Sequence, residues 1–357
     1  MNNVTRIQDA LRERKLDGVL INDEKNQRYA LGFPFTDGAV LLSQDDAWLI
    51  TDSRYVEAAA AAVGGWAEVL TFDAKRGLTE RINSRIERAG IKRLALEEEK
   101  LSYAAYTRWQ QELNCTVVGA QDLFTQLRAV KSDWELDYMR HAQKISERAL
   151  METLHSIKPG VSEREIAAEL VYRMMKFGGE GVSFDPIVVA GAKTSMPHGV
   201  PGDELVVEGG FVTIDFGCLK GGYCSDMTRT FAVGKPTEEM ANVYDTVLKA
   251  QLAGIKAARA GITGAELDKA ARDVIAAAGH AEHFGHGFGH SLGLDIHESP
   301  SANPRNDKPL PEGCAVSAEP GIYLPGRFGV RIEDVIVLRD GGCENITGFP
   351  KELIVLQ

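Results

Sequence analysis

The sequence has few cysteines, and none of them belongs to a paired motif. Five cysteines are spread over 357 residues, with no CxxC spacing. A disulfide framework is therefore not indicated, and we expect a protein of the reducing cytoplasm. Cys218 and Cys224 lie in an acidic segment described below, and we interpret them as small core residues rather than as soft metal ligands.

Long apolar runs and an excess of positive charge are also absent. No stretch of about 18 apolar residues occurs, so we expect no membrane-spanning helix. Residues 1–18 have the pattern of an amphipathic helix and lack the apolar stretch and cleavage site of a signal peptide. With 40 Lys and Arg residues against 51 Asp and Glu residues, the formal net charge is -11. We therefore expect neither nucleic acid nor a membrane as a partner.

The chain instead has the length and composition of a globular protein with two domains. Apolar residues make up 44% of the chain and charged residues 25%. Residues 1–127 alternate between strand and helix patterns, which predicts an α/β layer domain without an obvious catalytic set. Residues 128–357 are expected to form the catalytic domain. In the first domain we expect strands at 16–22, 38–43, 47–52, 67–72 and 93–99, and helices at 4–15, 54–63, 78–90 and 102–113.

The second domain contains an internal repeat. A long helix is predicted from Ser132, where Glu135 completes a capping-box signature, to Pro159. The segment 157–170 then resembles the segment 257–271, because Gly, Ser or Thr, and Glu recur at equal spacing. We predict a duplication with pseudo-twofold symmetry, in which each copy donates one acidic hairpin to a central site. The equivalent positions are Gly160 and Gly261, Ser162 and Thr263, and Glu165 and Glu266.

Each copy carries two acids placed symmetrically about a glycine turn. In VTIDFGCLKGGYCSDMTR, Asp215 and Asp226 flank a Gly-Gly pair, and we expect them to face each other across a hairpin. In AEPGIYLPGRFGVRIED, Glu319 and Glu333 are equidistant from Gly326. Carboxylates about 5 Å apart in an apolar core repel each other unless a cation lies between them. Two such pairs predict one metal site with four carboxylates.

A histidine-rich stretch lies between the two hairpins. The segment HFGHGFGHSLGLDIHE contains four histidines among glycines, which allow backbone to approach a ligand closely. One histidine can complete the carboxylate site, but four cannot all be ligands, so any one of them can instead have a structural or supporting role. His198, which follows Pro197 in a predicted loop, is open to the same two interpretations.

Together these motifs resemble those of the pita-bread metallopeptidases, in the Xaa-Pro branch that includes prolidase and aminopeptidase P. The segments NQRYALGF and TDSRY and the linker KSDWELDYMRHA are also similar to that branch. The resemblance implies an α/β (α+β) chain, with a creatinase-like N-terminal α/β domain and a C-terminal pita-bread domain. The main matching pieces are PHG at 197–199, DFG at 215–217, SDMTRTF at 225–231, HGFGHSLGLDIHE at 286–298, EPGIY at 319–323 and GVRIED at 329–334.

The resemblance also implies two divalent metal ions, with Mn²⁺ expected first and Co²⁺, Zn²⁺ or Fe²⁺ as alternatives. Asp226 and Glu333 would bridge the ions. His198 and His297 would face the substrate and steady the developing oxyanion. The implied ligands are Asp215, Asp226, His290, Glu319 and Glu333. The residues expected beside or behind these ligands are His286, Thr228, Arg331 and Tyr223.

The implied reaction is hydrolysis of the Xaa-Pro bond at the N terminus of short peptides, by a cytoplasmic homodimer. A water activated by the ions would attack the scissile carbonyl, and Glu319 would pass the water's proton to the proline nitrogen. In some dipeptidases of this branch, an arginine closely follows the HE motif. Here Ser301 stands near that place and Arg305 further on, so dipeptidase and aminopeptidase P both stay open.

Two other functions are compatible with the same fold. A catalytically retired pita-bread protein would act as a peptide- or protein-binding module. Such copies typically lose ligands, and none is missing here. An enzyme with other chemistry, such as creatine hydrolysis, resembles this branch in fold but does without the metal set. The intact ligand set therefore argues against both alternatives.

Overall fold

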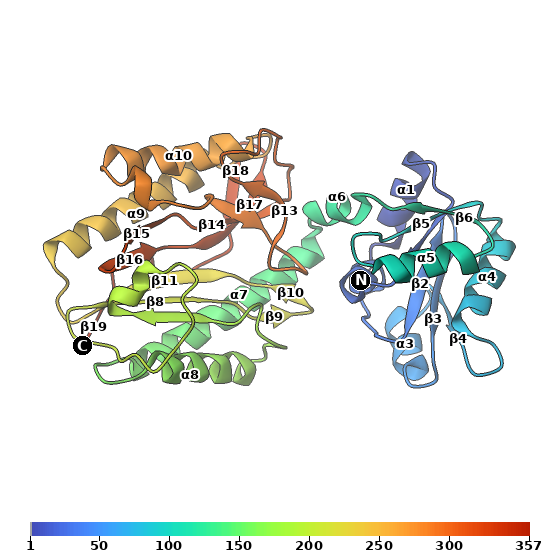
Figure 1. The fold of residues 1–357 in the computed structure, drawn as a ribbon, viewed down its shortest axis with the longest axis horizontal. Helices are drawn as coiled ribbons and strands as arrows, with labels where there is room; N and C mark the ends of the chain where they lie inside the picture. Colours follow the sequence, from blue (N-terminus) through green and yellow to red (C-terminus); the bar gives the residue numbers. More distant parts are fainter. Residues whose placement is uncertain (1) are drawn as a thin grey trace. The chain divides into compact units, whose positions relative to one another are not determined.

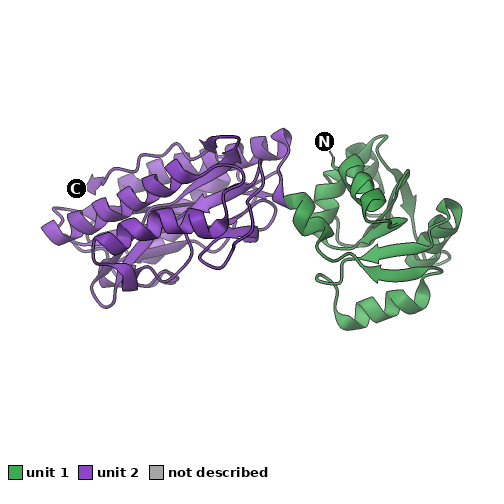
Figure 2. Cartoon of the chain, turned by 90° about the horizontal axis from the view of Figure 1, so that it is seen from above, with its two compact units in different colours: residues 1–128 green, residues 129–357 purple. Residues whose placement is uncertain are grey.

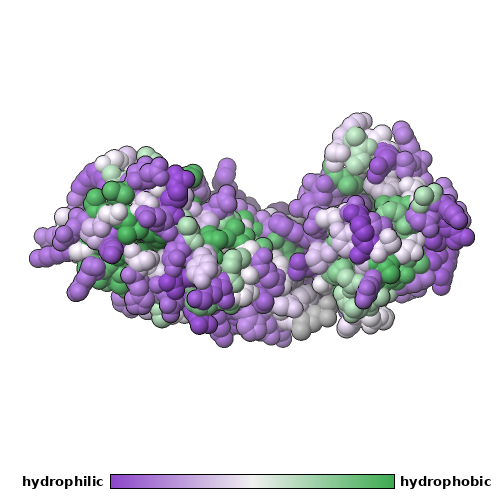
Figure 3. Space-filling model, turned by 90° about the horizontal axis from the view of Figure 1, so that it is seen from below, coloured by the Kyte–Doolittle hydropathy of each residue, from purple (hydrophilic) through white to green (hydrophobic). Residues whose placement is uncertain are grey.

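The computed structural model describes residues 2–357, in two compact units that divide after Arg128 (Figure 2). The division lies next to the boundary expected between residues 127 and 128. The first unit has a core of its own, and the second unit has two. None of the described helices combines the length and the apolar character needed to cross a membrane. On the face drawn in Figure 3, hydrophobic side chains form separate patches between hydrophilic ones.

The first unit is a six-stranded mixed sheet with helices packed against it (Figure 1). The strand order is β4-β3-β2-β1-β5-β6, and β1 is parallel to β5 but antiparallel to β2. The strands are β1 (Gly18–Ile21), β2 (Gly38–Ser43), β3 (Ala47–Thr51), β4 (Glu68–Thr71), β5 (Arg93–Leu96) and β6 (Thr116–Gly119). The helices are α1 (Val4–Glu13), α2 (Glu24–Leu31), α3 (Val56–Val63), α4 (Leu78–Ala89), α5 (Tyr103–Glu112) and α6 (Leu123–Ala129).

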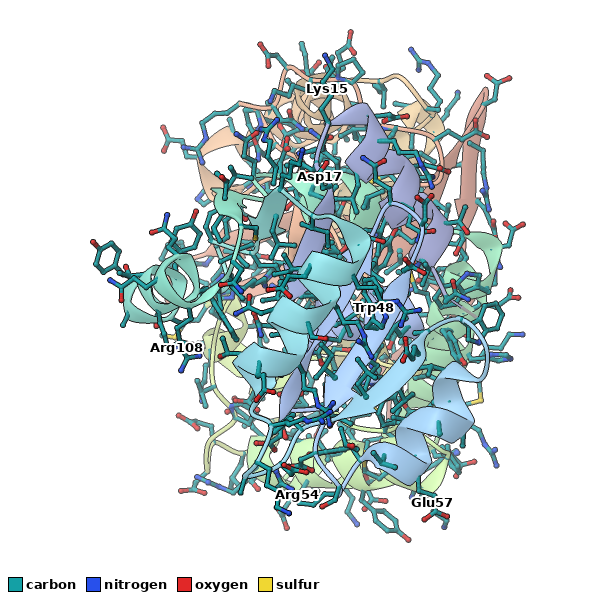
Figure 4. The ribbon with its side chains drawn as sticks, turned by 90° about the vertical axis from the view of Figure 1, so that its right-hand side faces the viewer. Lys15, Asp17, Trp48, Arg54, Glu57 and Arg108 are labelled. Carbon is teal, nitrogen blue, oxygen red and sulfur yellow. The ribbon has the colours of Figure 1, made fainter. Side chains whose placement is uncertain are left out.

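Apolar spacing explains where the helices of this unit bury a face. Helix α4 buries Ile82 and Ile86, which are one helical turn apart, in the cluster that contains Trp48 of β3. Figure 4 shows Trp48 in the interior of the unit and the labelled Arg54 and Glu57 at its edge. The predicted strands and helices of this unit are confirmed, whereas β6, α2 and α6 were not predicted.

The second unit carries the predicted site and is built from two similar halves. Helices α7 (Asp133–Thr153) and α8 (Glu163–Lys176) pack on a sheet ordered β19-β11-β8-β7. Helices α9 (Glu238–Ala257) and α10 (Gly264–Ala277) pack on a sheet ordered β13-β12-β14-β17-β18. Figure 1 shows the two helix pairs on opposite sides of this unit, with the strands between them.

Two further strand pairs, β9 with β10 and β15 with β16, extend the hairpins of this unit. The strands of the first half are β7 (Ile187–Ala190), β8 (Phe211–Phe216), β9 (Leu219–Lys220), β10 (Tyr223–Cys224), β11 (Met227–Val233) and the later β19 (Val355–Leu356). Those of the second half are β12 (Gly289–Ser291), β13 (Glu298–Ala302), β14 (Ala315–Ala318), β15 (Gly321–Leu324), β16 (Phe328–Arg331), β17 (Asp334–Arg339) and β18 (Gly342–Asn345).

The repeat predicted from the sequence is present in the helix starts of both halves. Helix α8 begins with a capping box made by Ser162 and Glu165, and α10 begins with one made by Thr263 and Glu266. In each box the glutamate accepts hydrogen bonds from the backbone and the hydroxyl of the capping residue. A third capping box, at Ser132, confirms the predicted start of α7.

The glycines before α8 and α10 also occupy equivalent places. Gly160 has a φ of +91° and Gly261 a φ of +81°, a region that favours glycine. The N–H of Gly160 donates to the carbonyl of Val206 at 2.9 Å, and the N–H of Gly261 donates to that of Leu310 at 2.9 Å. Each half therefore makes an equivalent backbone hydrogen bond at this place, in addition to having the same sequence pattern. Each half then continues into an acidic hairpin.

Candidate metal centre

The first acidic hairpin joins β8 to β11 through two glycines. Gly221 and Gly222 have φ values of +58° and +78°, so they occupy the central positions of a tight turn. Asp215 consequently lies opposite Thr228, so the prediction that it faces Asp226 directly is wrong by two residues. The reason is that the turn is centred one residue later than predicted. Asp226 is instead a diagonal neighbour of Asp215 on the same face of the hairpin.

The second acidic hairpin is centred where the sequence predicts. Strands β15 and β16 pair symmetrically about Gly326. The same register continues in β14 and β17, where Ala318 lies opposite Asp334. Glu319 follows Ala318 and Glu333 precedes Asp334, so the two glutamates occupy facing positions. This part of the prediction is confirmed.

His290 on β12 completes a compact cluster with the acids. Its Nε2 is 3.6 Å from Asp226 Oδ2 and 3.4 Å from Glu319 Oε1. Its Nδ1 lies 3.1 Å from the carbonyl oxygen of Ser291, a contact that assigns the proton to Nδ1 and leaves Nε2 for a ligand. Asp226, His290 and Glu333 each offer one ligand atom within 4.8 Å of the others.

The acids of this cluster are buried and poorly satisfied. Oδ1 of Asp215 and Oδ1 of Asp226 are buried without a hydrogen-bond partner. Burial, with the charges of Asp215 and Glu319, raises the pKa of Asp226 well above its usual range. Burial, with the charge of Asp226, does the same to the pKa of Glu333, and burial raises the pKa of Glu319. A bound cation would relieve both the repulsion and the unpaired oxygens.

Arg331 links the two hairpins behind the acids. Its Nη2 donates to Asp215 Oδ2 at 2.7 Å, and its Nε donates to Thr228 Oγ1 at 3.1 Å. Thr228 in turn donates to Glu333 Oε2 at 2.6 Å. Burial opposes the charge of Arg331, but Tyr323 and Asp215 outweigh it and raise the pKa of the guanidinium. Arg331 and Thr228 thus lie where they were expected, next to the ligand candidates.

His286 joins this network through a tyrosine that was not predicted. Its Nε2 is 2.9 Å from the hydroxyl of Tyr323, which accepts a hydrogen bond from Arg331 Nη1 at 2.9 Å. Its Nδ1 is 2.9 Å from the carbonyl of Gly287. These contacts direct the Tyr323 proton to His286, and burial lowers the pKa of this histidine. Tyr323 is the last residue of the motif EPGIY, which begins at Glu319, so its place in this motif could have identified it.

A pocket of about 360 Å³ brings the predicted residues together. All five candidate ligands line it, along with His198, His286, His297 and Arg331. His198 and His297 are exposed, and the ring of His297 lies 4.3 Å from that of His290 between centroids. Burial and the neighbouring His290 lower the pKa of His297. The other lining residues are Phe184, Ile187, Pro197, Gly287, Gly289, Ile296, Ser301 and Asn303.

Tyr223 contacts the start of α7. Its hydroxyl donates to Glu135 Oε1 at 2.8 Å. Its ring stacks on Tyr138, with centroids 6.0 Å apart and planes 1° apart. These contacts hold Tyr223 near the tip of the first hairpin, and its supporting role for the ligands stays a prediction.

Sequence reasoning also missed Arg229, which ties the two hairpins together. Its Nη1 donates to the backbone carbonyls of Thr228 and Glu333, at 2.9 and 2.6 Å. Its Nη2 donates to Asp334 at 2.8 Å, and two further bonds reach carbonyls of the segment 349–350. The guanidinium is buried and fully bonded. Its partners are remote in sequence, so no local pattern reveals this role.

The donor set fits divalent metal ions. Carboxylate oxygens with one imidazole suit Mn²⁺, Co²⁺, Fe²⁺ or Zn²⁺, and the unpartnered oxygens of Asp215 and Asp226 are free to accept such an ion. A duplicated α/β unit with an acid–histidine cluster between its halves defines a class of metal-binding proteins.

Both units match known families. Residues 137–340 match metallopeptidase family M24, and residues 4–130 match the creatinase/prolidase N-terminal domain. A peptidase of Bacillus subtilis is 41% identical over 342 residues, which cover 96% of each chain. The Xaa-Pro dipeptidase from Bacillus anthracis is similar in structure, with a TM-score of 0.94, 40% identity and coverage of 99% of each chain.

An X-Pro aminopeptidase from Thermotoga maritima MSB8 is similar as well, with a TM-score of 0.92 and 39% identity, over 97% of this chain and 99% of that one. The chain belongs to metallopeptidase family M24. The family and the fold class predicted from the motifs are thereby confirmed.

Proposed function

We propose that this protein is a metal-dependent peptidase that hydrolyses the Xaa-Pro bond at the N terminus of short peptides. The observation that carries the proposal is the cluster of four carboxylates and His290, in a pocket that also contains three other histidines. The names of the similar structures, an Xaa-Pro dipeptidase and an X-Pro aminopeptidase, support the substrate class.

Two divalent ions are the proposed cofactor, with Mn²⁺ as the first choice. Asp215, Asp226, His290, Glu319 and Glu333 would hold them, with Asp226 and Glu333 shared between the two. When bound, the ions would supply an activated water and polarise the scissile carbonyl. The choice of Mn²⁺ rests on the hard oxygen donors, and Co²⁺, Zn²⁺ and Fe²⁺ suit the same set.

The protein's own side chains would move the proton and hold the substrate. Glu319 would accept the proton of the attacking water and give it to the leaving proline nitrogen. Ser317 Oγ orients it by donating to Glu319 Oε1 at 3.0 Å. His198 and His297, the exposed histidines of the pocket, would donate hydrogen bonds to the carbonyl oxygen as it becomes negative.

The residues that line the pocket support a proposal about the length of the substrate. An Xaa-Pro dipeptide has a free carboxylate next to its proline, and a protein recognises such a group best with a cation. Among the described residues that line the pocket, Arg331 is the only lysine or arginine. Its guanidinium already donates to Asp215, Thr228 and Tyr323. We therefore propose an activity of the aminopeptidase P type, with the prolidase type as the alternative.

A paired assay tests this proposal. Hydrolysis of Ala-Pro is compared with release of Ala from Ala-Pro-Ala, on one Mn²⁺-loaded preparation with a chelated control. We expect metal-dependent release of Ala from the tripeptide. Cleavage of the dipeptide alone would identify a prolidase and contradict the proposed length preference. If neither peptide is cleaved in a metal-dependent way, the Xaa-Pro proposal fails and the retired, peptide-binding alternative is favoured.

A cytoplasmic homodimer is the proposed working form. All five cysteines are unpaired, which suits a reducing compartment. The dimer rests on the resemblance to the Xaa-Pro branch. Light scattering after size-exclusion chromatography tests it, because a mass of one chain, 38.9 kDa, would contradict the dimer.

A further inference from the structure

One buried carboxylate binds both ends of the loop that carries His198. Glu163, the first residue of α8, accepts the N–H of Ala190 at 2.8 Å through Oε1 and that of Gly202 at 2.9 Å through Oε2. Oε2 also accepts from Lys193 Nζ at 2.6 Å. The Glu163 side chain is fully buried. The loop between the two amide groups is therefore closed by Glu163, with His198 inside it.

The second half has a comparable arrangement at His286. Asp268 on α10 accepts the N–H of Phe288 at 2.9 Å, and its two oxygens accept from Arg272 at 2.7 and 3.0 Å. Arg272 also donates to the carbonyls of Phe284 and His286, at 2.9 and 2.7 Å. The side chain of Asp268 is buried. The backbone on both sides of His286 is thus held by one ion pair.

A third pair holds the loop that leads to His297. Lys131 Nζ is 3.0 Å from Glu298 Oε2, and the two side chains are only 1% and 6% exposed. Glu298 Oε1 accepts the N–H of Asp295 at 3.1 Å. The backbone N–H of Lys131 donates to the carbonyl of Gly313 at 3.0 Å, so the lysine is itself held in place.

In all three places, a buried carboxylate accepts hydrogen bonds from one or two backbone amides near a histidine of the pocket, and a cation balances its charge. We infer that Glu163, Asp268 and Glu298 are positioning residues, which fix the three pocket histidines outside the ligand set. The inference rests on the proposed function, because it takes His198 and His297 to face the substrate and His286 to support the ligands through Tyr323. None of the three carboxylates lines the pocket itself.

The physical reason lies in the loops. Loops are more mobile than helices and strands, and the glycines around His286 make that loop still less restricted. Hydrogen bonds from backbone amides to a charged carboxylate are stronger than bonds between neutral groups. A catalytic group misplaced by about 1 Å can lose roughly a hundredfold in rate. Hydrogen bonds to buried carboxylates restrain the backbone of these loops, and the carboxylates themselves stay outside the pocket.

Glu163→Gln is the sharpest test, because glutamine keeps the size but offers one acceptor oxygen for two amide groups. We expect kcat for Ala-Pro-Ala to fall roughly 10- to 100-fold. KM and the Mn²⁺ dissociation constant are expected to stay within about twofold of the parent, because the loss is confined to the transition state. Hydrogen exchange, followed by mass spectrometry, is expected to rise in the segment 190–202.

Two variants of Lys193 and one matched control complete the design. Lys193→Met is expected to give the same pattern with a smaller loss, and Lys193→Arg, which keeps the charge, to restore activity. Glu97→Gln is the control: Glu97 is a buried carboxylate of the first unit that accepts N–H groups of Asn22 and Asp23, at 2.6 and 3.0 Å. No pocket histidine lies on that loop, so we expect Glu97→Gln to change neither kcat nor exchange in 190–202.

Parental kcat in Glu163→Gln would overturn the inference, as would a loss of Mn²⁺ affinity large enough to explain the loss of activity. If the parent protein cleaves neither peptide, the proposed function fails, and hydrogen exchange still decides whether Glu163 is an anchor. Faster exchange in 190–202 for Glu163→Gln but not for Glu97→Gln supports the anchor, and equal exchange refutes it. Should Glu163→Gln not fold, Lys193→Met is judged by the same criteria.

Discussion

At the scale of single residues, the charge balance of the site depends on Arg331. Of the four carboxylates, Asp215 has this arginine within 2.7 Å. Asp226, Glu319 and Glu333 have raised pKa values, chiefly because they are buried. The metal-free site therefore binds protons more readily than isolated carboxyls do, and protons and metal ions compete for the site.

Arg331→Met is expected to lower the free energy of unfolding of the metal-free protein by about 3–5 kcal/mol, because the buried carboxylate of Asp215 loses its partner. Mn²⁺ is expected to restore part of this loss, since the ions would neutralise the same carboxylates. Urea unfolding with and without Mn²⁺ measures both effects. Arg305→Met, at an exposed position, serves as the control and should change stability by less than about 0.5 kcal/mol. Equal stabilities of the two variants would contradict the role of Arg331.

The metal-free protein is also expected to become less stable as the pH rises above about 4, the usual pKa range of carboxyl groups. The pKa values of Asp226, Glu319 and Glu333 are raised above those of the unfolded chain, so the folded state binds more protons. The stability that these groups contribute is present at low pH and is lost as the pH passes their folded pKa values. Thermal unfolding in EDTA at several pH values tests this. A melting temperature that rises with pH would refute it.

At the scale of secondary-structure elements, the two acidic hairpins differ in how their turns are fixed. The first turn contains Gly221 and the second contains Gly326, and both have positive φ. A Cβ on Gly221 would lie 2.4 Å from the ring of Tyr138, whereas a Cβ on Gly326 would meet no described atom within 4 Å. The first turn is therefore fixed by packing as well as by backbone conformation, and it sets the register of the acids on β8 and β11.

Gly221→Ala is accordingly expected to cost more stability than Gly326→Ala. Each substitution places alanine at positive φ, which costs about 1 kcal/mol or more. Only the Gly221 variant adds the clash with Tyr138. The same variant should also weaken Mn²⁺ binding, because it disturbs the register of the first hairpin. Urea unfolding and calorimetric titration of the two proteins test this, and a larger loss in the Gly326 variant would speak against it.

Elements with strong local signals could be predicted from the sequence. The capping residues Ser132 and Ser162 marked two helix starts correctly. Helix α2 carried a similar signal, since the side chain of Asp23 accepts from the N–H of Asn26, and it was overlooked. The short strand β6, TVVG, was overlooked as well. The register of the first hairpin was misjudged because both glycines, and not one, occupy its turn.

In the candidate site, too, the residues in local motifs could be predicted, and those that depend on remote partners could not. The acids and His290 stand in short motifs, so their spacing was visible in the sequence. The roles of Arg229 and Glu163 depend on partners that lie far along the chain: Arg229 binds the carbonyl of Glu333, and Glu163 binds the amide of Gly202. Such contacts follow from the tertiary fold, which no local pattern contains.

At the scale of the whole molecule, all five proposed ligands belong to the second unit, and each unit has its own hydrophobic core. We therefore expect chelation to lower the unfolding temperature of the second unit and to leave that of the first unchanged. An ion at a hundred times its dissociation constant stabilises the protein that binds it by about 2.7 kcal/mol. Scanning calorimetry with EDTA and with Mn²⁺ measures the shifts, and equal shifts in both transitions would contradict this expectation.

The contacts of Arg229 also bear on the order of synthesis. The ribosome makes the first unit, α7, α8 and the first hairpin before it reaches Glu333, and domains tend to fold as they emerge. The two hydrogen bonds from Arg229 to the carbonyls of the segment 349–350 can form only after that segment has been made. A nascent chain that stops before this point has the acids of both hairpins but lacks two of the five hydrogen bonds of Arg229. We therefore expect a chain that ends before residue 349 to hold its acidic hairpins less firmly and to bind metal ions less tightly than the full chain.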